Sequence, residues 1–160
     1  MSVAIGGDAG KVAGRRDNRS AAMQLLYLHD LYPFVPVAGH WQNLQNMLGL
    51  PDAGYEFCLD LAAGTIANLK EINGHMQRLL VNWSPERVER VPVAILRLAL
   101  YELIHRRDMP VAVVINEAVE LGKRFAGPAA ARFINGLLDQ FHRDREAAQR
   151  EPCNDLSLGD

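Results

Sequence analysis

The chain has 160 residues, 49% of them apolar, and a formal net charge of −2. This length fits one compact domain or two small subdomains that share an interface. Because the molecule as a whole is not a polycation, any affinity for nucleic acid must come from a local basic patch.

The charges are distributed unevenly along the chain. Near the N-terminus, four cations stand against Asp17 alone, which leaves that segment with a net charge of +3: they are Lys11, Arg15, Arg16 and Arg19. The last twenty residues hold five acids against three arginines. We expect the C-terminal tail to repel nucleic acid, so the N-terminal arm is the candidate patch.

Three features favour a cytoplasmic protein. The two cysteines, Cys58 and Cys153, are too few for a disulfide framework. The segment 1–10 lacks the basic and apolar regions of a signal peptide. The segment 31–51 contains no charged residue, but its prolines and side-chain amides argue against a membrane span.

The predicted elements are nearly all helices, because the alternation typical of strands is missing. We expect the ends, 1–14 and 144–160, to be disordered, since they lack apolar periodicity. The first helix is predicted to start at Asp17 or Asn18, either of which can cap it, and to end at Leu31.

Two further helices are predicted in the first half of the chain. A short helix covers about 41–48, and a longer one begins near Asp52 and carries one apolar face. We expect Asn73-Gly74 to interrupt this longer helix.

The second half begins at Ser84-Pro85-Glu86, which predicts a helix start. A strongly apolar helix then follows over 93–105, and a regular apolar stripe predicts another from Val111 to Gly127-Pro128. The last helix carries an apolar face made by Phe133, Ile134, Leu137, Leu138 and Phe141. We interpret Gly136, within this helix, as a close contact between helices.

No catalytic or metal-binding constellation is present in the sequence. The stretch GGDAGK fails as a phosphate-binding loop, because Ile5 and Val12 replace its required glycine and hydroxyl residue. The five histidines are scattered and no cysteine has a neighbouring ligand, so we expect no metal and no cofactor. These absences favour a binding protein over an enzyme.

Three residues still admit a catalytic interpretation. Glu117 and Glu120 share a helix face, but Glu120 stands four residues before Arg124, as in an ordinary surface pair. Cys58 lies on an apolar stripe, which predicts a buried thiol rather than a nucleophile.

The arginines of the arm suggest RNA as a partner. Arg15, Arg16 and Arg19 lie at the start of the first helix, where the helix dipole disfavours cations. Arginine binds phosphate with two parallel hydrogen bonds, and RNA is read by such groups together with aromatic rings. Gln24 and Tyr27 lie farther along the same helix; the alternative is a solvated basic start with Tyr27 in the core.

Four C-terminal motifs resemble, in order and spacing, the signature of the NusB transcription antitermination factors. They are ILRLALYEL (95–103), Asp108-Met109-Pro110, INEAVELGKRF (115–125) and FINGLLD (133–139). The stretch RRDNRSAAMQLLYLHD (15–30) is similar to the arginine motif and first helix of that family. The resemblance covers roughly 15–142.

The resemblance implies an all-α fold of about seven helices in two small bundles packed at an angle, over 15–78 and 79–143. It also implies a function without catalysis. Members bind the boxA segment of nascent single-stranded RNA together with NusE, which is also a small-subunit ribosomal protein. The complex joins RNA polymerase and suppresses termination, notably on ribosomal RNA operons.

Residue by residue, the resemblance implies two sets of contacts. The predicted RNA-binding residues are Lys11, Arg15, Arg16, Arg19, Gln24, Tyr27, Arg132 and Phe133. The predicted protein-partner residues are Glu89, Arg90 and Glu102. The chain departs from the family where Asp17 and Asn18 interrupt the arginine motif, and where Pro92 and Ala129 stand at positions that often carry an acid.

Two alternatives remain open. One is an interaction module of the same fold that binds RNA weakly, either as a monomer or as a homodimer that hides the arginine arm. The other is an RNA methyltransferase, since such enzymes carry a similar N-terminal domain. We do not expect the enzyme, because the chain ends near the end of that domain and contains no glycine-rich cofactor loop.

Overall fold

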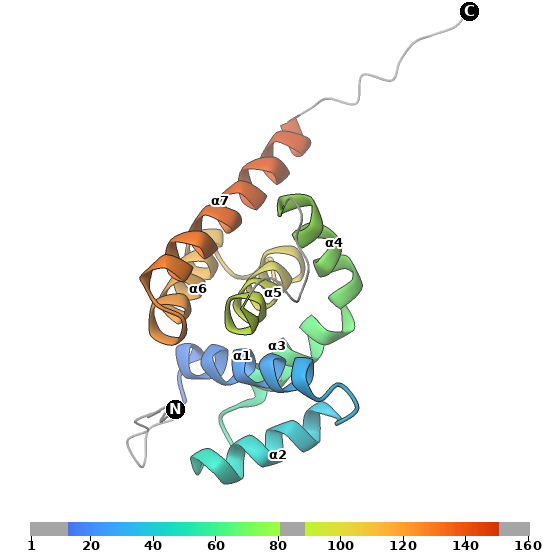
Figure 1. Ribbon diagram of the computed structural model, residues 1–160, viewed down its shortest axis with the longest axis vertical. Coiled ribbons are helices and arrows are strands. Elements are labelled where there is room, and N and C mark those ends of the chain that lie inside the picture. Colours follow the sequence, from blue (N-terminus) through green and yellow to red (C-terminus); the bar gives the residue numbers. More distant parts are fainter. Residues whose placement is uncertain (1–12, 81–88, 151–160) are drawn as a thin grey trace, which may run out of the picture.

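The computed structural model describes residues 13–80 and 89–150, and these ranges contain seven helices and no strand. The all-helical prediction is therefore confirmed. Figure 1 shows the helices in order: α1 (Arg15–Leu31), α2 (Val37–Leu48), α3 (Glu56–Ala67), α4 (Leu69–Leu79), α5 (Arg90–His105), α6 (Val111–Phe125) and α7 (Pro128–Arg150). None of these helices is long and apolar enough to cross a membrane.

Helix α5 is the centre of the molecule. Its residues from Pro92 to Leu103 are all buried, and it packs against α1, α3, α4, α6 and α7 (Figure 1). The stretch 93–105 was predicted only as a strongly apolar helix; a helix that is apolar on nearly all sides is buried among other helices, and α5 is. The buried cluster contains residues of all seven helices, so the two predicted subdomains share one continuous core.

The start of α1 differs from the prediction. The helix begins at Arg15, with Gly14 as the residue before it, and the carboxylate of Asp17 accepts a hydrogen bond from the Gly14 N–H at 3.3 Å. Asp17 thus stabilises the start from the third position of the helix rather than from the cap. Asn18 is buried inside α1, where its side chain donates to the Gly54 carbonyl and accepts from the Cys58 N–H at 2.8 Å.

The predicted interruption at Asn73-Gly74 is wrong, because α4 runs through both residues. The break falls at Asn68, whose side-chain amide donates to the Gly64 carbonyl at 2.7 Å and satisfies the end of α3. The predicted start at Ser84-Pro85-Glu86 lies outside the described residues.

The close approach between helices occurs at a different glycine from the one predicted. A Cβ atom on Gly136 would meet no atom within 4 Å, so that prediction is wrong. A Cβ atom on Gly122 would lie 2.9 Å from Ile134 Cδ1 and 3.1 Å from Ala131 Cα. Gly122 therefore lets α6 and α7 pack closely, and the side of α7 that carries Gly136 faces open space.

Helix α7 is also longer than predicted. Residues 144–150 were expected to be disordered but continue the helix. One physical reason is Arg145, which donates to the Leu103 carbonyl near the C-terminal end of α5 and attaches this part of α7 to the core. The remaining residues of the two predicted disordered ends, 1–12 and 151–160, lie outside the described ranges.

Candidate RNA-binding surface

Arg19 is buried in an ion pair. Its Nε donates to both carboxylate oxygens of Glu102 at 3.1 Å, and its Nη2 donates to Oε1 at 2.9 Å. The side chains of Arg19 and Glu102 are only 4% and 2% exposed, respectively. Arg19 was predicted as an RNA contact and Glu102 as a partner contact, but in this fold each charged group is enclosed by the other.

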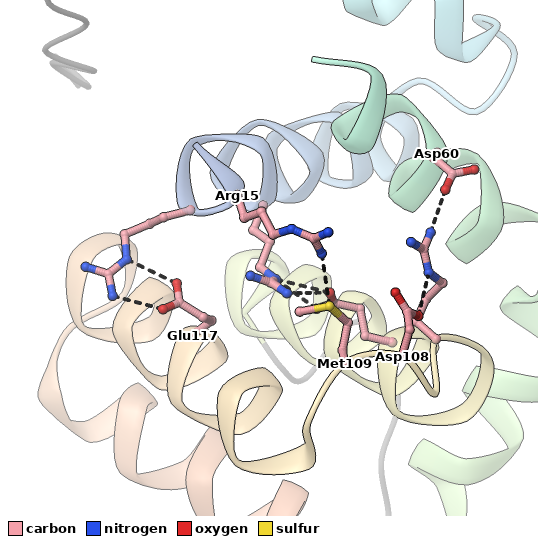
Figure 2. A network of polar contacts seen from close by, with 9 residues as sticks. Arg15, Asp60, Asp108, Met109 and Glu117 are labelled. Atoms are coloured by element: carbon pink, nitrogen blue, oxygen red, sulfur yellow. Dashed lines mark hydrogen bonds and ion pairs between the residues drawn. The ribbon is translucent and has the colours of Figure 1, made fainter. Parts of the chain in front are cut away.

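Arg16 is exposed but also paired. Its Nε and Nη2 donate to the carboxylate of Glu117 on α6 at 3.1 and 2.9 Å. In Figure 2, these two bonds are the dashed lines that end at Glu117. The hydrogen bond from Arg16 lowers the pKa of Glu117, and the same bond raises the pKa of Arg16. Within the described part of the chain, no acceptor engages Nη1 of Arg16. The outer edge of this guanidinium is thus available to a ligand.

Arg15 lies over an aromatic ring. Its guanidinium carbon is 4.6 Å from the centre of the Phe57 ring. Its Nη1 contacts the Met109 sulfur at 3.0 Å, as Figure 2 shows. The guanidiniums of Arg106 and Arg19 lie 5.5 and 5.6 Å from the same ring. Such contacts between cations and ring faces are attractive. They tie the start of α1 to α3 and to the turn between α5 and α6.

The arginine cluster is largely neutralised by acids. Arg106 pairs with Asp60 and Asp108, as Figure 2 shows, and Arg16 and Arg19 pair with glutamates. Within the described residues, Arg15 has no ion-pair partner. The charges of Arg16 and Arg19 are therefore balanced inside the fold, and Arg15 is the most available of the three described arginines of the arm.

The other predicted RNA residues lie at different places. Gln24 and Tyr27 are half-buried on α1, and the Gln24 amide donates to the Ser20 carbonyl at 3.3 Å. Lys11 lies outside the described residues.

Arg132 and Phe133 do not share one side of α7. Arg132 is exposed and lines a groove between α6 and α7. Phe133 is 39% exposed and stands one turn before Leu137, which lines a small space with leucines of α4 and α5. Because residues four apart share a helix face, Phe133 belongs to this second flank. The two adjacent side chains therefore project about 100° apart around α7.

The start of α5 presents the remaining predicted partner residues. Glu89 and Arg90 are both exposed. Nη1 of Arg90 donates to Asp30 at 2.8 Å, and Asp30 also lies 3.5 Å from the buried guanidinium of Arg97. Pro92 is buried here and has no polar side chain to offer a partner.

Cys58 is a buried thiol, as the apolar stripe predicted. It is fully buried, and burial raises the pKa of its thiol to about 12. A group with this pKa stays protonated at neutral pH and is a poor nucleophile. Among the described residues, no group of three or more His, Cys, Asp or Glu side chains could hold a metal ion.

We expect Cys58 to resist alkylation by iodoacetamide at pH 8 in the folded protein and to react within minutes in 6 M guanidinium chloride, because unfolding returns its pKa to about 8.5. Mass spectrometry of the peptide that contains Cys58 measures the modification. The extent of alkylation of Cys58 is compared with that of Cys153 in the same sample. Rapid modification of Cys58 in the folded protein would contradict its burial.

Comparisons with known proteins agree with this architecture. A family model described as "NusB family" matches residues 16–143. The protein "Transcription antitermination protein NusB" of Syntrophotalea carbinolica is 39% identical over 143 residues, which cover 81% of this chain and 92% of that protein. The protein of the same name from Heliobacterium modesticaldum is 36% identical over 137 residues. That match covers 86% of this chain but only 66% of the Heliobacterium protein.

A solved structure has the same fold. It is described as "Crystal Structure of Antitermination Factors NusB and NusE in complex with dsRNA". The similarity has a TM-score of 0.73 at 24% identity and covers 81% of this chain and 96% of the other. At this level of identity, the match supports the arrangement of the helices.

Proposed function

The chain belongs to the NusB family, and from this premise we propose that it binds boxA-type single-stranded RNA together with NusE. Its curated relatives are transcription antitermination proteins, not enzymes. We propose the corresponding role here: in the cytoplasm, the protein joins an RNA polymerase complex that suppresses termination, notably on ribosomal RNA operons. The related NusB and NusE structure with RNA supports the choice of both partners.

The exposed pair Arg15 and Arg16 carries the RNA proposal. Arg15 has no acidic partner among the described residues, and Arg16 keeps its Nη1 edge free while Glu117 holds the other edge. Two fixed guanidiniums at the start of α1 suit phosphate oxygens, which accept paired hydrogen bonds from arginine. Holding Arg16 in place before binding reduces the entropy that the complex must lose.

We propose that the start of α5 contacts the protein partner. Glu89 and Arg90 are accessible there, whereas Glu102 is enclosed by Arg19. Arg90 is held by Asp30, which gives this surface a defined polar group.

The test is a double substitution, Arg15→Ala with Arg16→Ala, titrated against boxA-type RNA in the presence of NusE. We expect the affinity to fall by about a hundredfold, since the variant loses at least two charged hydrogen bonds and each contributes roughly a factor of ten. The salt dependence should also flatten, by about 0.7 for each phosphate of a single strand that the variant no longer binds. Isothermal titration at several salt concentrations measures both quantities.

A matched control is the double substitution Lys70→Ala with Arg78→Ala, which removes two exposed cations from α4. It should leave the affinity nearly unchanged. An equal decrease in RNA affinity in both double variants would mean that binding depends only on the total charge of the protein. Arg19→Ala is a poor probe, because it leaves Glu102 buried without a partner.

One observation favours the second candidate, an interaction module with weak RNA binding. Arg16 and Arg19 are both paired with glutamates inside the fold, which reduces the positive potential of the arm. A scrambled RNA separates the two candidates: equal binding of scrambled and boxA-type RNA with NusE present would favour the interaction module.

A further inference from the structure

Helix α2 lies at the edge of the molecule and leaves one of its sides uncovered. It packs on α1 and α3, and Figure 1 shows it along the lower edge of the described structure. The side that faces the core carries His40, Trp41 and Leu44, which are all buried. The opposite side of α2 is therefore open to a further contact.

Large apolar side chains stand at both ends of this open side. Phe34, in the turn before α2, is 97% exposed, and Met47, in the last turn of α2, is 72% exposed. Tyr32, close to Phe34 in the chain, is 59% exposed. An exposed phenylalanine leaves about 150–250 Å² unburied, and apolar side chains gathered on one surface mark interaction sites. We name the turn 32–36 and the open side of α2 together the α2 surface.

No charged side chain interrupts the α2 surface. The segment 31–51 contains no Asp, Glu, Lys or Arg, although 22% of the chain is charged. RNA requires cations, and a partner recognised by its charge requires opposite charges, so neither suits this surface. A second copy of the chain does suit it. A two-fold interface places a surface against itself, where any charge would meet its own copy and repel it.

The α2 surface is also complementary to itself. Residues four apart form a ridge on a helix, and the ridge on the open side of α2 runs through Val35, Gly39, Asn43 and Met47. Val35 reaches the next position of this ridge, since a Cβ atom on Gly39 would lie 3.1 Å from its Cγ1. When two copies pack antiparallel, Met47 of one lies beside Phe34 and Val35 of the other. Gly39 then lies beside Asn43, so a small residue faces a larger one.

This arrangement gives each exposed group a suitable neighbour. A methionine sulfur makes favourable contacts with an aromatic ring, as Met47 would with Phe34 of the other copy. Between these ends, α2 exposes side-chain amides at Gln42, Asn43 and Asn46. An amide has both donors and acceptors, so it can bond to the same amide of a second copy.

We propose that the α2 surface joins two copies of this chain in an antiparallel, two-fold dimer. The arginine arm stays accessible in this dimer, because Arg15 lies over Phe57 of α3 and Arg16 bonds to Glu117 of α6. The dimer therefore differs from a homodimer that hides the arm, and each particle carries two arms. The inference goes beyond the proposed function and does not depend on RNA binding.

The size of the α2 surface sets the strength of the dimer. Helix α2 has 12 residues and is thus about 18 Å long. Two copies of Phe34 and Met47, with the amides between them, bury roughly 1,000 Å² in total, which is at the low end for specific interfaces. Interfaces of this size associate weakly and reversibly. We expect a dissociation constant on the order of 10–100 µM.

The test is sedimentation equilibrium of the full chain from about 5 to 500 µM, a range that brackets this constant. We expect the mean mass of the wild-type protein to rise from monomer toward dimer. The double substitution Phe34→Glu with Met47→Glu should raise the dissociation constant at least about tenfold, because it places like charges in the interface. The matched control is Val113→Glu, which changes a 40% exposed apolar residue of α6 and should leave dimerisation unchanged.

A charge exchange tests the antiparallel arrangement. In Phe34→Lys with Met47→Glu, the new cation of one copy lies beside the new carboxylate of the other, so this variant should dimerise more strongly than the double glutamate variant. If both variants are equally monomeric, the two ends do not meet and the arrangement is wrong. The substituted side chains are exposed, so circular dichroism should show that each variant is folded.

Three results would overturn the dimer. One is a wild-type protein that stays monomeric at about 500 µM, well above the expected constant. Another is a dimer that persists in the double glutamate variant, because a different surface then joins the copies. The third is a monomeric wild-type protein whose affinity for NusE falls in that variant, because the α2 surface then belongs to this partner. RNA affinity measured on dilute, monomeric protein should be equal in wild type and variant, so the proposed function is tested separately.

Discussion

Replacement of Glu102 by alanine is expected to lower the free energy of unfolding by about 3–5 kcal/mol, because it leaves the buried charge of Arg19 without a partner. The Arg19 and Glu102 side chains are almost fully enclosed and joined by three hydrogen bonds. If one member is removed, the other charge stays buried away from water, and no ion pair offsets that cost. Urea denaturation followed by circular dichroism measures the change.

The control for this experiment is Glu120→Ala. Glu120 forms an exposed pair with Lys123 on one helix, and such pairs contribute only about 0.3–0.5 kcal/mol. The double substitution Arg19→Met with Glu102→Leu should cost much less than the sum of the two single alanine changes, since no charge stays buried. A Glu102→Ala variant as stable as the control would mean that water reaches Arg19.

The buried pair also bears on RNA binding. It fastens α1 to α5 one turn after Arg15 and Arg16, so it fixes the place where their guanidiniums emerge. The sequence motif thus contains arginines of two kinds. Arg19 holds the helix in position, and the two preceding arginines are available to a ligand. A family motif alone does not make this distinction, because it records residue types and not their exposure.

The helices could be predicted from the sequence wherever one face is apolar. The stripe from Val111 predicted α6, which begins at that residue, and the long apolar run predicted the central helix α5. The ends were less predictable, because tertiary contacts decide them. Arg145 donates to a carbonyl near the end of α5, and this contact keeps the last residues of α7 helical. Asn68, rather than Asn73, ends a helix because its side chain bonds the last turn of α3.

The site was only partly predictable for the same reason. Arg16 and Arg19 find their acidic partners 101 and 83 residues away along the chain, so no local pattern reveals the pairing. Arg132 was identified through the family resemblance, but not its place in a groove with Lys123. Two cations nine residues apart on successive helices carry no periodic signal, and only the packing of α6 on α7 brings them to one opening.

Replacement of Gly64 by alanine should destabilise the protein, although the same change in an open part of a helix is stabilising. Gly64 lies on α3, and a Cβ atom there would collide with the Oη and Cζ atoms of Tyr101 on α5. Overpacking of this kind typically costs about 1–3 kcal/mol. Tyr101 is only 9% exposed and stacks on His105 at 5.4 Å, so it has little room to move.

The chain supplies a matched control in Gly74 on α4, where a Cβ atom would meet only Nη1 of the flexible Arg78 side chain, at 3.9 Å. Gly74→Ala should raise the free energy of unfolding by about 0.5–1 kcal/mol, which is the helix preference of alanine over glycine. The two substitutions are chemically identical. If thermal unfolding shows that Gly64→Ala lowers the stability and Gly74→Ala raises it, the contact with Tyr101 accounts for the difference. Equal stabilisation in both variants would mean that α3 and α5 separate easily, and that Gly64 does not set their distance.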